Sequence, residues 1–201
     1  MKLRSASYQA AWVVVILLGA VPAWTRPPES GRPNGLLREG SDLIGRPVPE
    51  WSVSHWIHSD SLSLGSLKGK VVLVRWWTAP DCSFCAATAP ALNEFNRLYR
   101  GKGLAVIGLY HHKRPSPLDP SEVEDLANRF GFQFPVAIDP EWQTLKRWWF
   151  NGRERAWTSV SFLVDRQGII RHIHPGGAYV KGDSDYAELK AKIEELLRES
   201  P

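Results

Sequence analysis

The sequence predicts an α/β fold in which a central, mixed β-sheet carries helices on both faces. Three patterns indicate this class. Apolar, β-branched runs alternate with segments of helical spacing. The run KVVLVRWW at Lys70–Trp77 is apolar at almost every position, which is typical of a strand buried on both faces. Near the end of the chain, two strand-like runs flank the polar turn Asp165–Gly168, which indicates an antiparallel hairpin.

The first half of the domain is predicted to hold three strands and one long helix. Trp51–Ile57 is a strand-like run, and Ser61–Lys70 contains turn residues that lead into the central strand. The helix follows that strand and ends at two glycines before the buried strand Leu104–Tyr110. Its apolar positions recur at steps of three and four: Cys85, Ala89, Leu92, Phe95 and Tyr99.

The middle of the chain is predicted to add two helices and a short strand. Asp119–Pro120 is a start signal for a helix that runs to Phe130, where Gly131 ends it. Phe134–Ile138 is strand-like, and Asp139–Pro140 then opens a Trp-rich helix to about Phe150.

The closing part of the domain is predicted to be a hairpin and a helix. Thr158–Val164 and Gly168–Ile173 are its strands, and we place the pair at one edge of the sheet. One apolar helical face follows, formed by Tyr186, Leu189, Ile193 and Leu197.

The N-terminus has the pattern of a targeting segment. Lys2 and Arg4 precede the apolar run Ala10–Ala20, and Val21-Pro22-Ala23 offers small residues for a signal peptidase. We therefore predict a signal peptide or membrane anchor over 1–23, a flexible linker over 24–44 and one domain over 45–201. The protein should be periplasmic or otherwise exported, or held at the inner membrane by this segment.

Charge and cysteine usage narrow the function. Without Lys2 and Arg4 the chain has 23 basic against 21 acidic residues, and no basic cluster favours a nucleic-acid partner. The sequence has only two cysteines, and two residues separate them. So short a loop constrains little chain, which favours a reactive pair over a stabilising one.

The two cysteines stand in the motif Asp81-Cys82-Ser83-Phe84-Cys85, where a buried strand gives way to a helix. Unpaired N–H groups and the positive end of the helix dipole favour a thiolate at Cys82. We therefore predict Cys82 as the attacking sulfur and Cys85, one turn later, as the resolving sulfur.

Around this motif the chain resembles the TlpA-like and ResA-like branch of the thioredoxin superfamily, within the redoxins that also include peroxiredoxins. The resemblance covers about 45–197 and lies in GRPVP, the strand KVVLVRWW, Cys-x-x-Cys, APAL and SFLVDRQGIIRHI. It implies a thioredoxin-like fold, a redox-active disulfide and a thiol-disulfide oxidoreductase. It further implies exported protein thiols or disulfides, including those of apocytochromes, as partners, and a membrane protein as electron donor.

The sequence departs from the family pattern at two places. Asp81 replaces the usual Trp before the first cysteine, and a carboxylate there opposes ionisation of the neighbouring thiol. Ser159 occupies the position where these proteins hold a cis-proline that docks substrate backbone. We predict that Thr158 and Ser159 still face the disulfide and bind substrate. The peptide bond before Ser159 is predicted to be trans, because a cis bond before a non-proline residue costs about 2.5–4 kcal/mol.

Other residues are candidates for proton transfer or pKa tuning. His111 and His112 follow the strand expected beside the cysteine strand, so either one is predicted at the same rim; a solvated loop is the alternative. Arg75 is a candidate for lowering a cysteine pKa, with a snorkelling position at the sheet edge as the alternative.

The tryptophans and histidines allow two further readings. Trp77, with Trp56, Trp76 and Trp157, is predicted to form an apolar, substrate-binding rim, although core packing is the ordinary role of such residues. A zinc site would need two ligands besides the cysteines, and the available histidines lack a typical spacing, so we expect no metal or other cofactor. These histidines are His111, His112, His172 and His174.

The leading functional hypothesis is therefore an exported oxidoreductase that exchanges disulfides with proteins. A thiol peroxidase is the first alternative, in which Cys82 attacks hydroperoxide and Cys85 resolves the sulfenic acid. Peroxiredoxins resemble one another in a Thr three residues before that cysteine, where this chain has Ala79. A redox-inert binding module is the second alternative.

Overall fold

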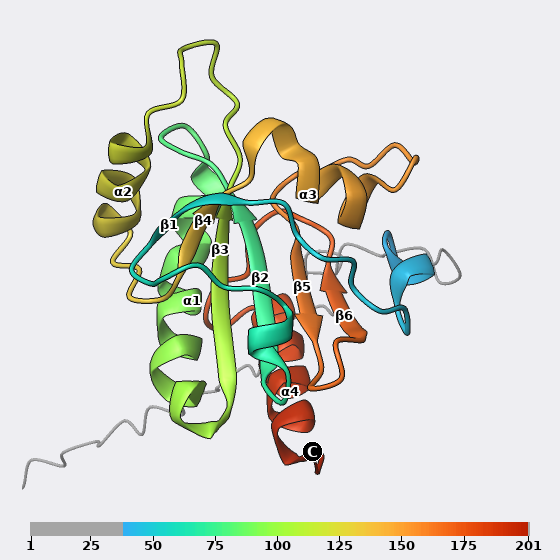
Figure 1. Cartoon of the computed structure of the whole chain (residues 1–201). Coiled ribbons are helices and arrows are strands. Elements are labelled where there is room, and N and C mark those ends of the chain that lie inside the picture. The colour runs from blue at the N-terminus through green and yellow to red at the C-terminus, as the bar shows by residue number, and fades with distance from the viewer. Residues whose placement is uncertain (1–37, 201) are drawn as a thin grey trace, which may run out of the picture. The chain divides into compact units, whose positions relative to one another are not determined.

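The computed structural model describes residues 38–200, which form a mixed sheet with strand order β1-β4-β3-β2-β5-β6 (Figure 1). Strands β2, β3 and β4 are parallel, whereas β1 pairs antiparallel with β4, β5 with β2, and β6 with β5. The predicted mixed sheet and its closing hairpin at one edge are thereby confirmed. The strands are β1 Ser54–Ile57, β2 Val71–Trp77, β3 Leu104–Tyr110, β4 Val136–Ile138, β5 Ser161–Val164 and β6 Ile170–His174.

Helices cover both faces of this sheet. One face packs against α1 (Ser83–Tyr99), α2 (Pro120–Arg129) and α4 (Ser184–Arg198), which contribute buried apolar side chains to a single cluster. The other face packs against Trp148 and Trp149, which come from the segment after β4. Two apolar layers thus enclose the sheet, as the alternation of strands and helices predicts.

Strand β2 lies at the centre and is buried along its whole length. Successive side chains of a strand point to opposite faces. Leu73 and Trp77 accordingly join the cluster with α1, whereas Val74 and Trp76 join the opposite cluster. The end of β2 is therefore fixed from both sides, directly before the chain enters the cysteine motif.

The predicted Trp-rich helix from Pro140 to Phe150 is wrong in its first part. The side chain of Asp139 accepts hydrogen bonds from the N–H groups of Thr144 and Leu145, so it caps a helix that begins several residues later than predicted. The chain reaches this cap through a short turn, Pro140–Trp142, in which Glu141 and Trp142 have positive φ. One turn of α-helix, α3 (Gln143–Leu145), and a π-helical turn, Lys146–Phe150, follow.

The residues before the domain are described only from Arg38 onward. Arg38 forms an ion pair with Glu188 of α4, and Leu43, in the short helix Ser41–Leu43, is buried. The predicted leader over 1–23 and most of the predicted linker lie outside the described residues. Within 38–200, no helix combines the length and apolar character needed to cross a membrane.

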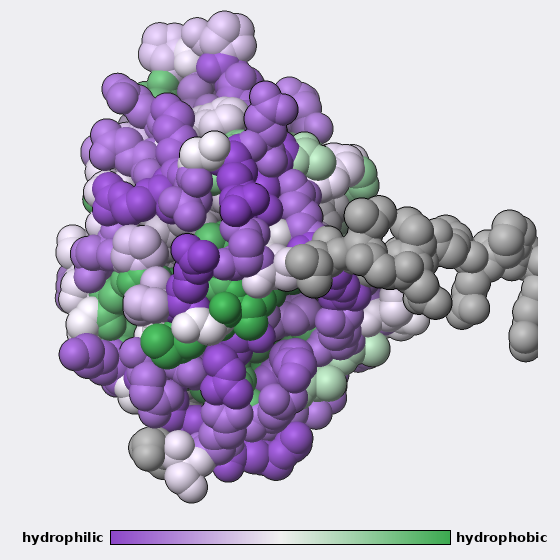
Figure 2. Space-filling model, turned by 90° about the vertical axis from the view of Figure 1, so that its right-hand side faces the viewer, coloured by the Kyte–Doolittle hydropathy of each residue, from purple (hydrophilic) through white to green (hydrophobic). Residues whose placement is uncertain are grey.

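The surface seen in Figure 2 is mostly hydrophilic, and hydrophobic side chains show only in small groups. Among residues 38–200, the exposed large apolar side chains are Ile44, Phe84, Leu118, Trp157 and Val180. Two of them, Phe84 and Trp157, lie together beside the cysteine motif, with ring centroids 5.2 Å apart. This pair forms the aromatic part of the site around the two cysteines.

Candidate active site

The site lies where the end of β2 meets the beginning of α1 (Figure 1). Cys82 is the N-cap of α1, and its Sγ accepts a hydrogen bond of 3.1 Å from the N–H of Cys85. A disulfide joins the two cysteines. The predicted position of Cys82 at the positive end of a long helix is confirmed, and this position favours a thiolate there.

The two sulfurs differ in access. Cys82 is half-buried and lines an open groove, whereas Cys85 is only 3% exposed and belongs to the apolar cluster under α1. A thiol from outside therefore reaches Cys82 first. The groove is lined by Thr78, Ala79, Asp81, Cys82, Ser83, Phe84, Lys113, Arg114, Ala156, Trp157, Thr158 and Ser159.

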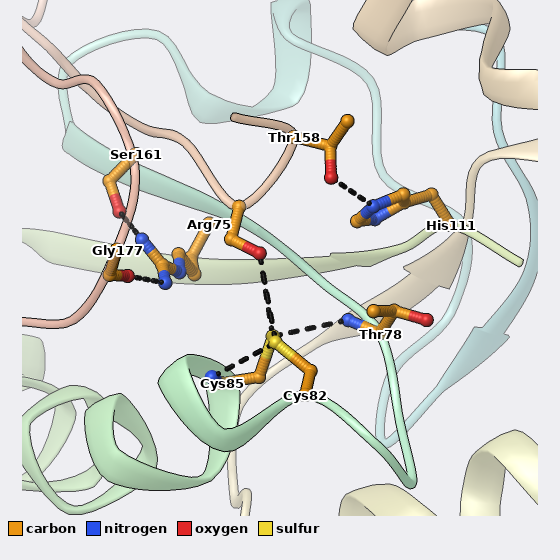
Figure 3. The surroundings of a disulfide bond; sticks show 9 residues. Arg75, Thr78, Cys82, Cys85, His111, Thr158, Ser161 and Gly177 are labelled. Carbon is orange, nitrogen blue, oxygen red and sulfur yellow. Dashed lines mark hydrogen bonds between the residues drawn. A yellow bond between two sulfur atoms is a disulfide. The ribbon is translucent and has the colours of Figure 1, made fainter. Parts of the chain in front are cut away.

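The inner sulfur meets two hydrogen-bond donors. The N–H of Thr78 lies 3.5 Å from Cys85 Sγ (Figure 3). The hydroxyl of Ser159 also lies 3.5 Å from this sulfur. The same hydroxyl is 3.8 Å from Cys82 Sγ. Ser159 thus faces the disulfide from the start of the closing hairpin, as the sequence predicts.

The Thr158–Ser159 peptide bond is trans, because the only cis bond among residues 38–200 is Ala79–Pro80. Two side-chain hydrogen bonds hold this loop in place. His111 Nε2 lies 3.0 Å from the Thr158 hydroxyl, and Trp149 Nε1 donates a bond of 2.7 Å to the carbonyl of Trp157.

His111 lies at the predicted edge of the sheet, but its environment is neither a site of proton transfer nor a solvated loop. Its side chain is fully buried, stacked edge-on against Trp142, so it does not belong to a solvated loop. Burial, together with the positive charges of Lys113 and Arg75, lowers the pKa of His111 to about 3. The predicted proton exchange near neutral pH is therefore corrected: at pH 7 the ring is neutral and holds Thr158.

His112 and Asp81 occupy more open positions. His112 contacts the Tyr110 hydroxyl through Nδ1 and the carbonyl of Ser116 through Nε2, and it is not among the groove residues. Asp81 is exposed on the groove wall beside Cys82. Of these two candidates, only Asp81 lies where a bound substrate would meet it.

Arg75 is buried in the centre of the sheet, so the alternative of a snorkelling side chain at the sheet edge is wrong. Its guanidinium donates to the hydroxyl of Ser161 at 3.3 Å and the carbonyl of Gly177 at 2.7 Å (Figure 3). It also lies over the ring of Tyr179. Burial lowers the pKa of Arg75, while Tyr179 raises it. The sequence-based prediction missed these partners, although the central position of β2 already argued against an edge.

The predicted tryptophan rim is reduced to Trp157. Trp77 is 1% exposed and packs against Tyr110, Phe130 and Phe132, so it cannot contact a substrate in this structure. Trp76 is buried on the other face of the sheet, and Trp56 packs against Trp51 there. Phe84, which the prediction did not assign to the rim, contributes the second exposed ring. Its place within the cysteine motif was the available signal.

The described residues contain no group of three or more histidine, cysteine or acidic side chains arranged to hold a metal ion. His172 and His174 lie on β6 beside Glu188 and Asp185, respectively, and are not among the groove residues.

Comparisons with known proteins agree with this geometry. The redoxin family model matches residues 45–191. Protein DipZ of Mycobacterium tuberculosis is 30% identical over 151 residues, which are 74% of this chain and 20% of DipZ. Thiol-disulfide oxidoreductase ResA of Bacillus anthracis is 28% identical over 127 residues, 63% of this chain and 66% of ResA. The chain thus spans only about a fifth of the length of DipZ.

Solved structures support the fold independently. The crystal structure of SPOA0173, a thioredoxin-like superfamily protein, superposes with a TM-score of 0.62 at 23% identity. The match covers 77% of this chain and 97% of that protein. The predicted thioredoxin-like fold is thereby confirmed.

Proposed function

The chain belongs to the redoxin family, and from this premise we propose that it is an exported thiol-disulfide oxidoreductase that exchanges disulfides with protein substrates through Cys82 and Cys85. The observation that carries the proposal is the asymmetry of the pair: one sulfur at a helix N-terminus on an open groove, the other buried behind it. Exchange through a mixed disulfide needs this division between an accessible and a resolving sulfur. The name of ResA, a thiol-disulfide oxidoreductase, supports the same reaction class.

The reaction proceeds in two exchanges. A substrate thiolate attacks Cys82 Sγ, the bond between the two protein sulfurs breaks, and its electron pair passes to Cys85 Sγ. A second substrate thiolate then attacks the substrate sulfur of the mixed disulfide and releases Cys82 as a thiolate. In the opposite direction Cys82 attacks a substrate disulfide, and Cys85 resolves the mixed disulfide by attacking the sulfur of Cys82.

Protein substrates fit the groove better than small thiols alone. Phe84 and Trp157 are 42% and 44% exposed and stand together beside Cys82. Exposed aromatic rings beside a reactive group supply apolar contact area for an extended polypeptide. Thr158 and Ser159 line the same groove and are proposed to contact that polypeptide.

Trapping tests the roles of the two cysteines. Cys85→Ser leaves an attacking thiol without a resolving one, so it should accumulate mixed disulfides with exported proteins. Cys82→Ser is the matched control and should trap far less, because Cys85 is buried. Equal trapping by both variants would reverse the assignment, and the absence of trapping and of thiol exchange by the wild type would contradict the proposed activity.

The same preparations distinguish the alternatives. A thiol peroxidase would consume hydroperoxide rapidly with both cysteines present. We expect slow turnover, because Ala79 replaces the Thr of peroxiredoxins and the Ser159 hydroxyl lies nearer to Cys85 Sγ than to Cys82 Sγ. A redox-inert module would neither reduce insulin disulfides nor exchange with glutathione. Rapid peroxide turnover with negligible insulin reduction would favour the peroxidase.

Export and the electron source rest on the N-terminal pattern and on the family resemblance. The basic residues Lys2 and Arg4, the apolar run and the small residues before Trp24 support export. Fractionation of cells that express the full chain tests this. A periplasmic form cut after Ala23, or an uncut form in the inner membrane, would support export, and a full-length cytoplasmic form would contradict it. A membrane protein as redox partner is part of the same proposal; it would donate electrons when the pair works as a reductase.

A further inference from the structure

The surroundings of Cys85 Sγ suit a negatively charged sulfur. Two donors, the Thr78 N–H and the Ser159 hydroxyl, converge on this atom at 3.5 Å each. Cys85 and Ser159 are both buried, so little water competes for these bonds. A disulfide sulfur is a weak acceptor, whereas a thiolate is a strong one, so both bonds strengthen when the pair is reduced.

A buried cation lies on the same side of the sheet. Arg75 points to the face of β2 that carries Leu73 and Trp77, the face that packs against α1 and Cys85. It pairs in register with Ser161, two residues along the chain from Ser159. The groups around its guanidinium are a hydroxyl, a carbonyl and an aromatic ring, all of them neutral.

The positive charge of Arg75 acts on residues around the disulfide. It contributes to the lowered pKa of His111, whose ring contacts Thr158 next to Ser159. In a buried, low-dielectric site a positive charge stabilises an anion more strongly than it does in water. The anion that forms here during exchange is the thiolate of Cys85.

We propose that Ser159 is a further catalytic residue, whose hydroxyl donates a hydrogen bond to Cys85 Sγ as that sulfur leaves. Together with the Thr78 N–H and Arg75, it makes the disulfide an oxidant of substrate dithiols. The proposal rests on the proposed function and adds the direction in which the pair exchanges its disulfide. Stabilising the reduced form of such a pair raises its reduction potential, so the disulfide is passed on to the substrate.

Electrons and protons balance between the substrate and the cysteine pair. The substrate dithiol loses two electrons and becomes a disulfide, and the Cys82–Cys85 disulfide gains the two electrons. The two protons leave to water as each substrate thiol ionises, and Cys82 and Cys85 take protons up from water to the extent that their thiolates do not stay ionised. Cys85 Sγ receives the electron pair of the broken bond in the first exchange, and Cys82 Sγ receives that of the mixed disulfide in the second. A disulfide of higher potential, on a partner protein, must then reoxidise the pair.

The test is the equilibrium of the purified protein with reduced and oxidised glutathione. Ser159→Ala should shift this equilibrium about tenfold toward the disulfide form, which is about 30 mV for a two-electron couple. Ser159→Thr keeps the hydroxyl and should restore most of the difference. Thr88→Val is the matched control, because it removes a buried hydroxyl of α1 that has no hydrogen-bond partner.

The contribution of Arg75 is read in the same assay. Arg75→Met should shift the equilibrium in the same direction as Ser159→Ala, and Arg75→Lys, which keeps the charge, should shift it less. Should Arg75→Met fail to fold, the comparison of Arg75→Lys with the two Ser159 variants still tests the proposal.

Failure of this inference can be distinguished from failure of the proposed function. The wild-type pair should be mostly reduced in a glutathione buffer in which a thioredoxin-type disulfide stays oxidised. An oxidised pair in that buffer, or a Ser159→Ala variant with an unchanged equilibrium, would overturn the inference while exchange itself continued. A wild type that exchanges with neither glutathione nor insulin would instead contradict the proposed function.

Discussion

Replacing His111 by Asn should remove much of the loss of stability that the protein suffers in mild acid. The folded ring has a pKa of about 3, against an ordinary value of 6.5. Between these values the unfolded chain binds a proton at this residue and the folded protein does not, so acid favours unfolding. Each pH unit below 6.5 lowers the free energy of unfolding by about 1.4 kcal/mol, so the total loss at pH 5 is about 2 kcal/mol.

Denaturant unfolding of the oxidised protein at pH 7 and pH 5 measures this effect. Between the two pH values the wild type should lose about 2 kcal/mol more than His111→Asn, a large share of an ordinary domain stability of about 5–15 kcal/mol. His174, whose pKa burial lowers to about 4, acts in the same direction in both proteins and cancels in the comparison.

The control is His58→Asn, which changes an exposed histidine with positive φ, a conformation that Asn tolerates. It should show the acid sensitivity of the wild type. If His111→Asn also lost as much stability as the wild type, burial would not hold the ring neutral, and the acid sensitivity would have to arise from other groups.

Three other substitutions test contacts of the groove and of the segment after β4. Trp157→Ala should lower kcat/KM about tenfold for a protein disulfide and leave the rate with glutathione within about twofold, because only a polypeptide reaches its ring; an equal fall for both substrates would contradict this. Gly176→Ala would place a Cβ 2.1 Å from Trp157 Cβ, so it should displace the Trp157 ring. It should therefore also lower kcat/KM for the protein disulfide more than the rate with glutathione, and kinetics on both substrates checks this. Asp139→Ala removes the acceptor of three buried hydrogen bonds, from Trp76, Thr144 and Leu145, and should cost about 3 kcal/mol of unfolding free energy in denaturant titration; a loss below about 1 kcal/mol would contradict the capping role.

The strands around the site could be predicted closely because their sequences are continuous apolar runs. Leu104–Tyr110 is observed with the predicted bounds, and the central strand differs by one residue. The segment after Asp139 could not be predicted as well. An Asp-Pro pair is an ordinary helix start, but in this fold the carboxylate reaches past Pro140 to cap Thr144 and Leu145.

Within the site, the sequence predicted where residues lie better than it predicted which groups their side chains contact. The places of Cys82, Cys85 and Ser159 followed from a strand, a helix start and an aligned hairpin. The burial of Trp77 and the partners of Arg75 depend on groups that lie far along the chain, such as the ring of Phe132, the hydroxyl of Ser161 and the carbonyl of Gly177. No local pattern near β2 predicts such contacts.

The donors that converge on Cys85 Sγ also bear on how firmly the protein holds its fold in each redox form. They meet at one atom only when the chain is folded, so any preference they give to the reduced pair is absent from the unfolded chain. By the thermodynamic cycle that links folding with reduction, the same free energy adds to the stability of the reduced fold. A four-residue loop yields about 2 kcal/mol of cross-link stabilisation to set against this. The tenfold preference expected from Ser159 is about 1.4 kcal/mol, so it offsets most of that stabilisation. Each turnover that passes the disulfide to a client should therefore change the stability of the fold far less than the loss of an ordinary disulfide does.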